Sequence, residues 1–83
     1  MSGGHFEYQQ YRIREIAGQV EELIEANEFP PEVMLEFENG LTLLRKAAVY
    51  AQRIDWLVSG DDGEESFFER LAAELGQIDA NHK

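Results

Sequence analysis

Acidic residues around a glycine form the first group in this sequence that could do chemistry. The segment Asp61-Asp62-Gly63-Glu64-Glu65 has the composition of a cation-binding loop. The calcium-loop template also needs ligands at its first and third positions, which are Val58 and Gly60 when Gly63 is set as the loop glycine. The template therefore fails. The sequence favours an acidic loop in front of a helix, and a weak divalent-cation site is the alternative.

Histidine is the other residue type that could bind a metal or transfer a proton, and the chain has 2. His5 and His82 lie near opposite ends of the chain, and neither belongs to a pattern that would place a base beside a serine or threonine nucleophile. There are 0 cysteines, which excludes a thiolate nucleophile, a disulfide and a cysteine-bound zinc. We therefore predict no enzyme, no metal centre and no cofactor.

A small-ligand site remains as a hypothesis. The Gly3-Gly4-His5 arm could close over a pocket beside the acidic loop. In that case the ligand would contact His5, Asp61, Asp62 and Glu65.

Composition limits the elements that could position such residues. The chain has 83 residues, which favours a single domain, and 17 acidic against 7 basic side chains, which argues against direct binding to nucleic acid. A hydrophobic content of 43% is too high for a disordered acidic tail. The start of the chain does not look like a signal peptide, and no apolar run is long enough to span a membrane. We expect an acidic domain over residues 1–83 in the cytoplasm, without membrane contact.

Hydrophobic periodicity predicts an all-α fold with three helices. Apolar residues recur at helical spacing over about 6–27, again over 31–58, and once more after the acidic loop. Short connections favour antiparallel neighbours. We predict a long central helix in an antiparallel hairpin with the first helix, and a shorter C-terminal helix that folds back. Residues 1–5 are expected to be a flexible arm, and residues 79–83 a frayed tail.

The C-terminal half of the central helix carries more apolar residues than one stripe needs. Leu41, Leu44, Ala48, Ala51 and Val58 form one stripe, and a second lies beside it at Leu43, Ala47, Tyr50, Ile54 and Leu57. A helix that is apolar over most of its circumference is usually buried on most sides. The surplus is either a modestly exposed rim or a contact surface for another chain. Our candidates for such an interface are Leu43, Val49, Tyr50, Arg53, Trp56 and Leu57.

Two stretches resemble a known set of sequences. The opening MSGGHFEY (residues 1–8) and the block YAQRIDWLVSGDDGEESF (residues 50–67) are similar to small uncharacterised proteins of bacteria and their phages. The resemblance implies a bacterial or phage setting, in which a small acidic protein could inhibit a host protein. It implies no catalytic activity.

Three classes of function follow from these patterns. The first is a non-enzymatic interaction module that self-associates as a homo-oligomer or docks on a protein partner through the long helix. The second is an acidic mimic of nucleic acid that blocks a DNA-binding protein, because spaced carboxylates can imitate phosphates. The third is the small-ligand or metal-binding protein described above.

Overall fold

The computed structural model describes residues 9–81, with the backbone alone for Ala80 and Asn81. It contains three helices: α1 (Gln10–Ala26), α2 (Pro31–Val58) and α3 (Glu64–Asn81). The described part of the chain has no strand. The predicted all-α fold is therefore confirmed.

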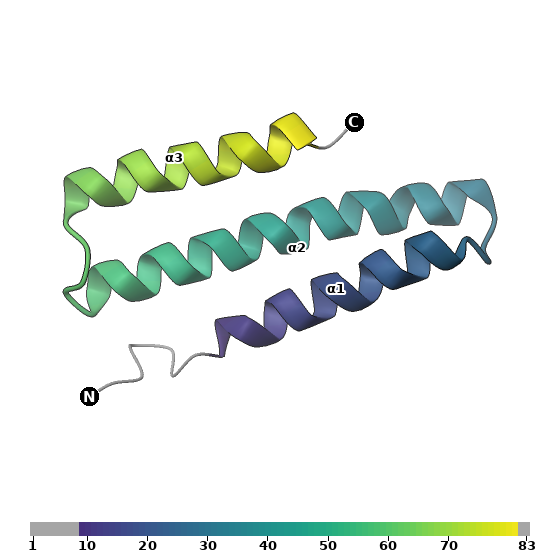
Figure 1. The fold of residues 1–83 in the computed structure, drawn as a ribbon, viewed down its shortest axis with the longest axis horizontal. Coiled ribbons are helices and arrows are strands. Elements are labelled where there is room, and N and C mark those ends of the chain that lie inside the picture. Colours follow the sequence, from purple (N-terminus) through teal and green to yellow (C-terminus); the bar gives the residue numbers. More distant parts are fainter. Residues whose placement is uncertain (1–8, 82–83) are drawn as a thin grey trace.

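The three helices lie side by side in one layer, with α2 in the middle (Figure 1). Helix α1 packs on α2 and α3 packs on α2, but α1 and α3 do not pack on each other. The molecule measures 45 × 25 × 13 Å along its principal axes. Its radius of gyration of 14.8 Å exceeds the about 12 Å typical of a compact chain of this length. The fold is thus an open layer that is one helix thick.

Specific residues set the two turns between the helices. Asn27 adopts a left-handed conformation (φ 54°) and donates its backbone N–H to the carbonyl of Leu23, which closes α1. Pro30 is extended and Pro31 begins α2, where its missing N–H does not break a helical hydrogen bond. At the other end, Gly60 has φ 87°, a left-handed conformation that glycine adopts readily after a helix.

Helix α2 runs without a break through Gly40. A Cβ added at Gly40 would have no neighbour within 4 Å. Gly40 therefore neither ends the helix nor marks a close approach of a second helix.

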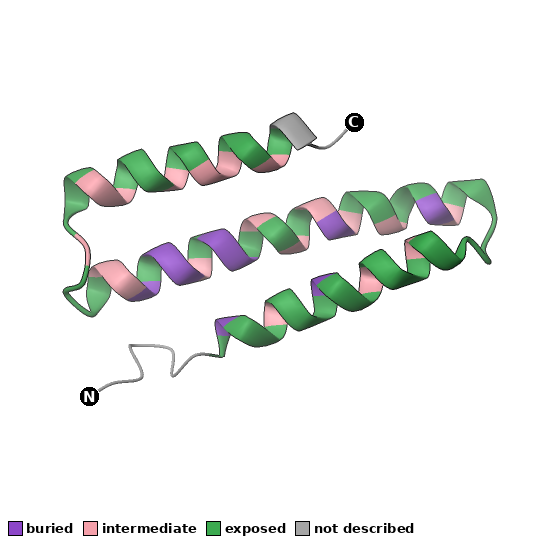
Figure 2. Ribbon diagram, in the orientation of Figure 1, coloured by how far each residue is buried: buried purple, intermediate pink, exposed green. Residues whose placement is uncertain are grey.

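The apolar core is small for a chain of this length. The buried hydrophobic residues among those described are Ala17, Met34, Leu41, Ala48 and Val49. Figure 2 shows that most buried positions lie on α2, and no residue of α3 from 64 to 79 is buried. Val58, which the sequence placed in the first apolar stripe, is 54% exposed. Helix α3 is therefore held without a deeply buried anchor of its own.

The C-terminal boundary differs from the expected one. Helix α3 continues to Asn81, so residues 79–81 are helical where a frayed tail was predicted. Within this stretch, the Asp79 carboxylate pairs with Lys46 Nζ of α2 at 2.8 Å. The expected flexible arm, residues 1–5, lies outside the described residues.

Candidate interaction surface

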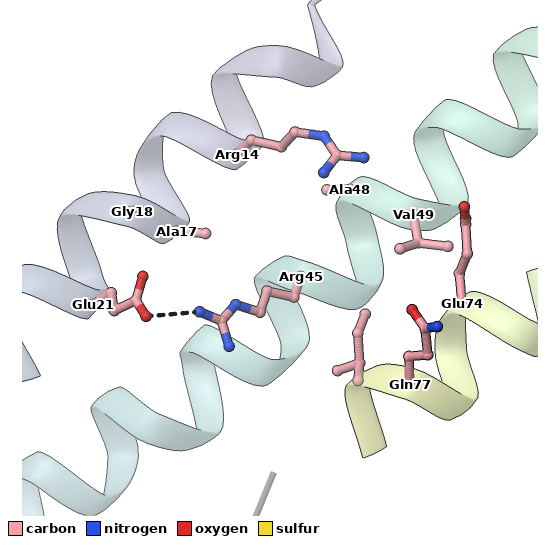
Figure 3. A pocket seen from close by; sticks show the side chains of 10 residues that line it. Arg14, Ala17, Gly18, Glu21, Arg45, Ala48, Val49, Glu74 and Gln77 are labelled. Atoms are coloured by element: carbon pink, nitrogen blue, oxygen red, sulfur yellow. Dashed lines mark ion pairs between the residues drawn. The ribbon is translucent and has the colours of Figure 1, made fainter. Parts of the chain in front are cut away.

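One face of the layer is hollowed into a groove to which all three helices contribute (Figure 3). Its volume is about 420 Å³. Glu21 of α1 and Arg45 of α2 form an ion pair of 3.1 Å along one side, and Glu74 and Gln77 of α3 lie on the other. Side chains of both charge signs line the groove, whereas ligand pockets are usually mostly apolar with a few converging polar groups. The groove therefore does not define a ligand class.

The opposite face carries several exposed apolar side chains, and the helical repeat of 100° per residue identifies them. On α1, Arg14, Gly18 and Glu21 line the groove, so Ile16 and Leu23 lie on the other side of the buried Ala17. On α2 and α3, the angular position of each exposed apolar residue relative to the groove-lining residues gives the remaining members. We call it the apolar face: Ile16 and Leu23 of α1; Leu43, Tyr50, Ile54 and Val58 of α2; and Phe68 of α3.

The side chains of the apolar face are well exposed. Leu43 and Phe68 are each 67% exposed, Tyr50 is 44% and Ile54 is 37%. Ile16 and Leu23 are also exposed. No helix of the described part lies over this face, because α1 and α3 pack against the two edges of α2. The predicted interface residues Leu43 and Tyr50 thus lie on an accessible surface, and Leu57 is half-buried beside them. Trp56 is also half-buried, but it lies seven residues after Val49 and so on the groove side of α2.

Two of the predicted interface residues lie inside the chain, which corrects their assignment to an accessible contact surface. Val49 is 8% exposed and lines the groove between α1 and α3. Arg53 is 6% exposed. Both project toward the neighbouring helices, so neither is available to another chain in this conformation.

Arg53 is buried because it joins α2 to α3 and to the loop between them. Its Nε and Nη2 atoms donate to the two carboxylate oxygens of Glu74 at 3.1 and 3.0 Å. Its Nη1 lies 3.5 Å from Asp62, and its guanidinium carbon lies 4.5 Å from the ring centre of Trp56. A bidentate carboxylate pair with an aromatic neighbour suits the planar guanidinium group. Arg53 is therefore a structural residue.

Part of the predicted ligand loop belongs to the same network of contacts as Arg53. Asp62 Oδ1 accepts a hydrogen bond from the Ser66 hydroxyl at 2.5 Å, and its other oxygen faces Arg53. Asp61 and Glu65 are exposed, whereas His5 lies outside the described residues. In the described part of the chain, no group of three or more His, Asp or Glu residues could hold a metal ion. Asp62 thus stabilises the turn into α3, and the three proposed ligand residues in the described range, Asp61, Asp62 and Glu65, do not form a metal-binding group.

A buried polar contact between α1 and α2 was not predicted from the sequence. Gln10 Nε2 donates to Asp55 Oδ2 at 3.1 Å, and the two residues are 3% and 2% exposed. Gln10 Oε1 is buried without a hydrogen-bond partner among the described residues. The only signal in the sequence was that Asp55 lies within the most apolar part of α2, where an unpaired carboxylate would be costly.

Comparisons of the chain with protein-family models, with curated proteins and with solved structures find no match. No helix in the described range combines the length and apolar character needed to cross a membrane. The class of this protein therefore rests on its geometry: an open all-α layer with one polar groove face and one apolar face.

Proposed function

We propose that this chain is a non-enzymatic protein–protein interaction module that binds through the apolar face. The proposal rests on the contrast between the apolar residues that are buried and those that are exposed. Only five hydrophobic residues of the described range are buried, and none is aromatic, whereas Leu43, Tyr50 and Phe68 are exposed. Contiguous apolar surface of this kind typically marks a contact site on a soluble protein.

The charged residues support the same proposal. Arg45 and Lys46 of α2 pair with acids of the flanking helices, and so does the buried Arg53. These three cations therefore hold the layer together instead of forming a reactive site. In the bacterial or phage setting that the resemblance implies, the occupant of the face is a protein of that cell.

Affinity capture from the native host with three baits tests this proposal. The wild-type chain is compared with Leu43→Glu, which places a charge on the apolar face, and with Leu35→Glu. Leu35 is a matched control because it is also an exposed leucine of α2, at 56% against 67% for Leu43, but lies outside the face. We expect a partner, or a second copy, to be lost with Leu43→Glu and kept with Leu35→Glu.

Equal recovery with all three baits would contradict docking through the apolar face. Salt dependence separates this proposal from nucleic-acid mimicry. Apolar contacts persist at high salt, whereas a mimic bound through its carboxylates is released as salt screens the charges. Release by salt, with no effect of Leu43→Glu, would favour the mimic.

A further inference from the structure

A one-helix layer leaves the apolar face without a second layer. Domains normally pack two layers of secondary structure around one core. Here the layer is 13 Å thick and α1 and α3 occupy the edges of α2, so the chain provides nothing in the described range that covers the middle of the face. The missing layer must come from outside these residues.

The exposed side of α2 has the pattern of a helix–helix seam. Leu43, Ala47, Tyr50, Ile54 and Leu57 follow one another at steps of 4, 3, 4 and 3 residues. This is the heptad spacing with which one helix packs along another. We call these five residues the α2 seam. Its pattern fits a second long helix better than a flat or irregular protein surface.

The seam is also free of charge, although the chain has a net charge of −10. The charged residues between Leu41 and Val58 are Arg45, Lys46, Arg53 and Asp55, and each contacts α1, α3 or the loop before α3. Each of them is therefore paired within the chain. Two copies of the seam can meet without burying an unpaired charge, which would oppose association.

We propose that the occupant of the α2 seam is a second copy of this chain, paired antiparallel about a two-fold axis near Tyr50. The inference rests on the proposed function and names the partner. In this arrangement Leu43 faces Leu57 of the other copy, and the small Ala47 faces the larger Ile54. A parallel pair would instead set Ala47 against Ala47 and leave a gap. A two-fold interface requires such a self-complementary surface.

The available area is sufficient for a stable dimer. A standard interface takes about 800 Å² from each partner. The layer measures 45 × 25 Å, so its whole broad side, of which the apolar face is a part, spans roughly 1,000 Å² and leaves room for an interface of that size. Ile16 and Leu23 on one side of the seam, and Phe68 on the other, extend the apolar contact beyond α2. The product is a two-layered assembly of six helices with both groove faces outward.

Sedimentation equilibrium of the wild-type chain, Leu43→Glu and Leu35→Glu tests the dimer. We expect the wild type to approach twice its mass of 9.5 kDa at micromolar concentration. Leu43→Glu should weaken association at least about 100-fold, because it would bury a carboxylate, whereas Leu35→Glu should change it by less than about threefold. Added salt should strengthen the dimer by screening repulsion between two acidic chains. Circular dichroism checks that each variant keeps its helices.

Disulfide cross-linking tests the orientation, because the natural chain contains 0 cysteines. A mixture of the Ala47→Cys and Ile54→Cys proteins should form a mixed disulfide dimer under mild oxidation. Ala47→Cys alone should form little. Efficient cross-linking of Ala47→Cys with itself would overturn the antiparallel arrangement.

The outcomes also separate this inference from the proposed function. A wild-type monomer at about 100 µM, a concentration that populates even weak complexes, would overturn the dimer. If that monomer still lost a host partner with Leu43→Glu, the interaction module would stand and only the identity of its partner would be wrong. If the wild type is a monomer and Leu43→Glu captures the same proteins as the wild type, both the dimer and the interaction module are wrong.

Discussion

Arg53→Ala should lower the free energy of unfolding by about 2–3 kcal/mol, a large part of the about 4–12 kcal/mol expected for a domain of this size. Arg53 is the buried polar link between α2 and α3, with Glu74 and Asp62 as its carboxylate partners. The Asp62 side chain is only 6% exposed, so removal of the guanidinium leaves that charge without compensation. We place the loss below the about 3–5 kcal/mol typical of a broken buried pair because the Glu74 side chain is 39% exposed.

Urea denaturation followed by far-ultraviolet circular dichroism measures this loss. Arg45→Ala is the matched control, because Arg45 also pairs with an acid of a flanking helix but is 44% exposed. We expect that control to lose less than about 1 kcal/mol. Backbone amide exchange should accelerate first in α3, which has no buried residue from 64 to 79. Similar losses for Arg45→Ala and Arg53→Ala would contradict the role assigned to Arg53.

Asp55→Ala should cost about 2 kcal/mol, through loss of a buried acceptor and the space left behind. Asp55 is 2% exposed and accepts a hydrogen bond from Gln10 at the start of α1. Without it, the buried Gln10 amide loses the acceptor for its N–H group. A double-mutant cycle with Gln10→Ala, measured by urea denaturation, should give a coupling free energy of about 1 kcal/mol.

Asp61→Ala is the control for Asp55→Ala, because Asp61 is exposed in the loop before α3. It should change stability by no more than about 0.5 kcal/mol. A coupling free energy near zero between Gln10 and Asp55 would mean that their hydrogen bond does not hold α1 on α2.

The helices and the α2 seam could be predicted from the sequence because both depend on local spacing. Pro31 and Gly60 mark the ends of α2, and the apolar repeat from Leu43 to Leu57 gives the angular position of each side chain around it. Neither feature depends on where the other helices lie. This is why the prediction of Leu43 and Tyr50 as exposed interface candidates is consistent with their accessible positions.

Val49 and Arg53 could not be assigned from spacing alone. The periodicity shows that they share a side of α2, but not that α3 lies against that side. Arg53 meets Glu74 across 21 positions of sequence, and that pairing depends on the path of the loop between the helices. A charged side chain within an apolar segment is equally compatible with a surface rim and with a buried ion pair. The structure distinguishes them through the position of α3.

The open-layer arrangement of the three helices could not be predicted from the sequence either. An antiparallel connection determines that α3 returns along α2, but not whether it joins α1 over a shared core or takes the opposite edge. In the structure it takes the opposite edge, and the Arg53–Glu74 and Lys46–Asp79 pairs hold it there. This choice leaves the apolar face uncovered, and the proposed function depends on it.

Hydroxyl-radical footprinting of the protein in extract from its native host tests most directly whether the apolar face is a contact surface. The measurement compares oxidation of Leu43 with that of Leu35, which is also exposed in the isolated chain. The account predicts that Leu43 becomes protected, by a second copy or by another protein, while Leu35 stays reactive. Oxidation of both leucines at the rates found in the dilute isolated chain would contradict it.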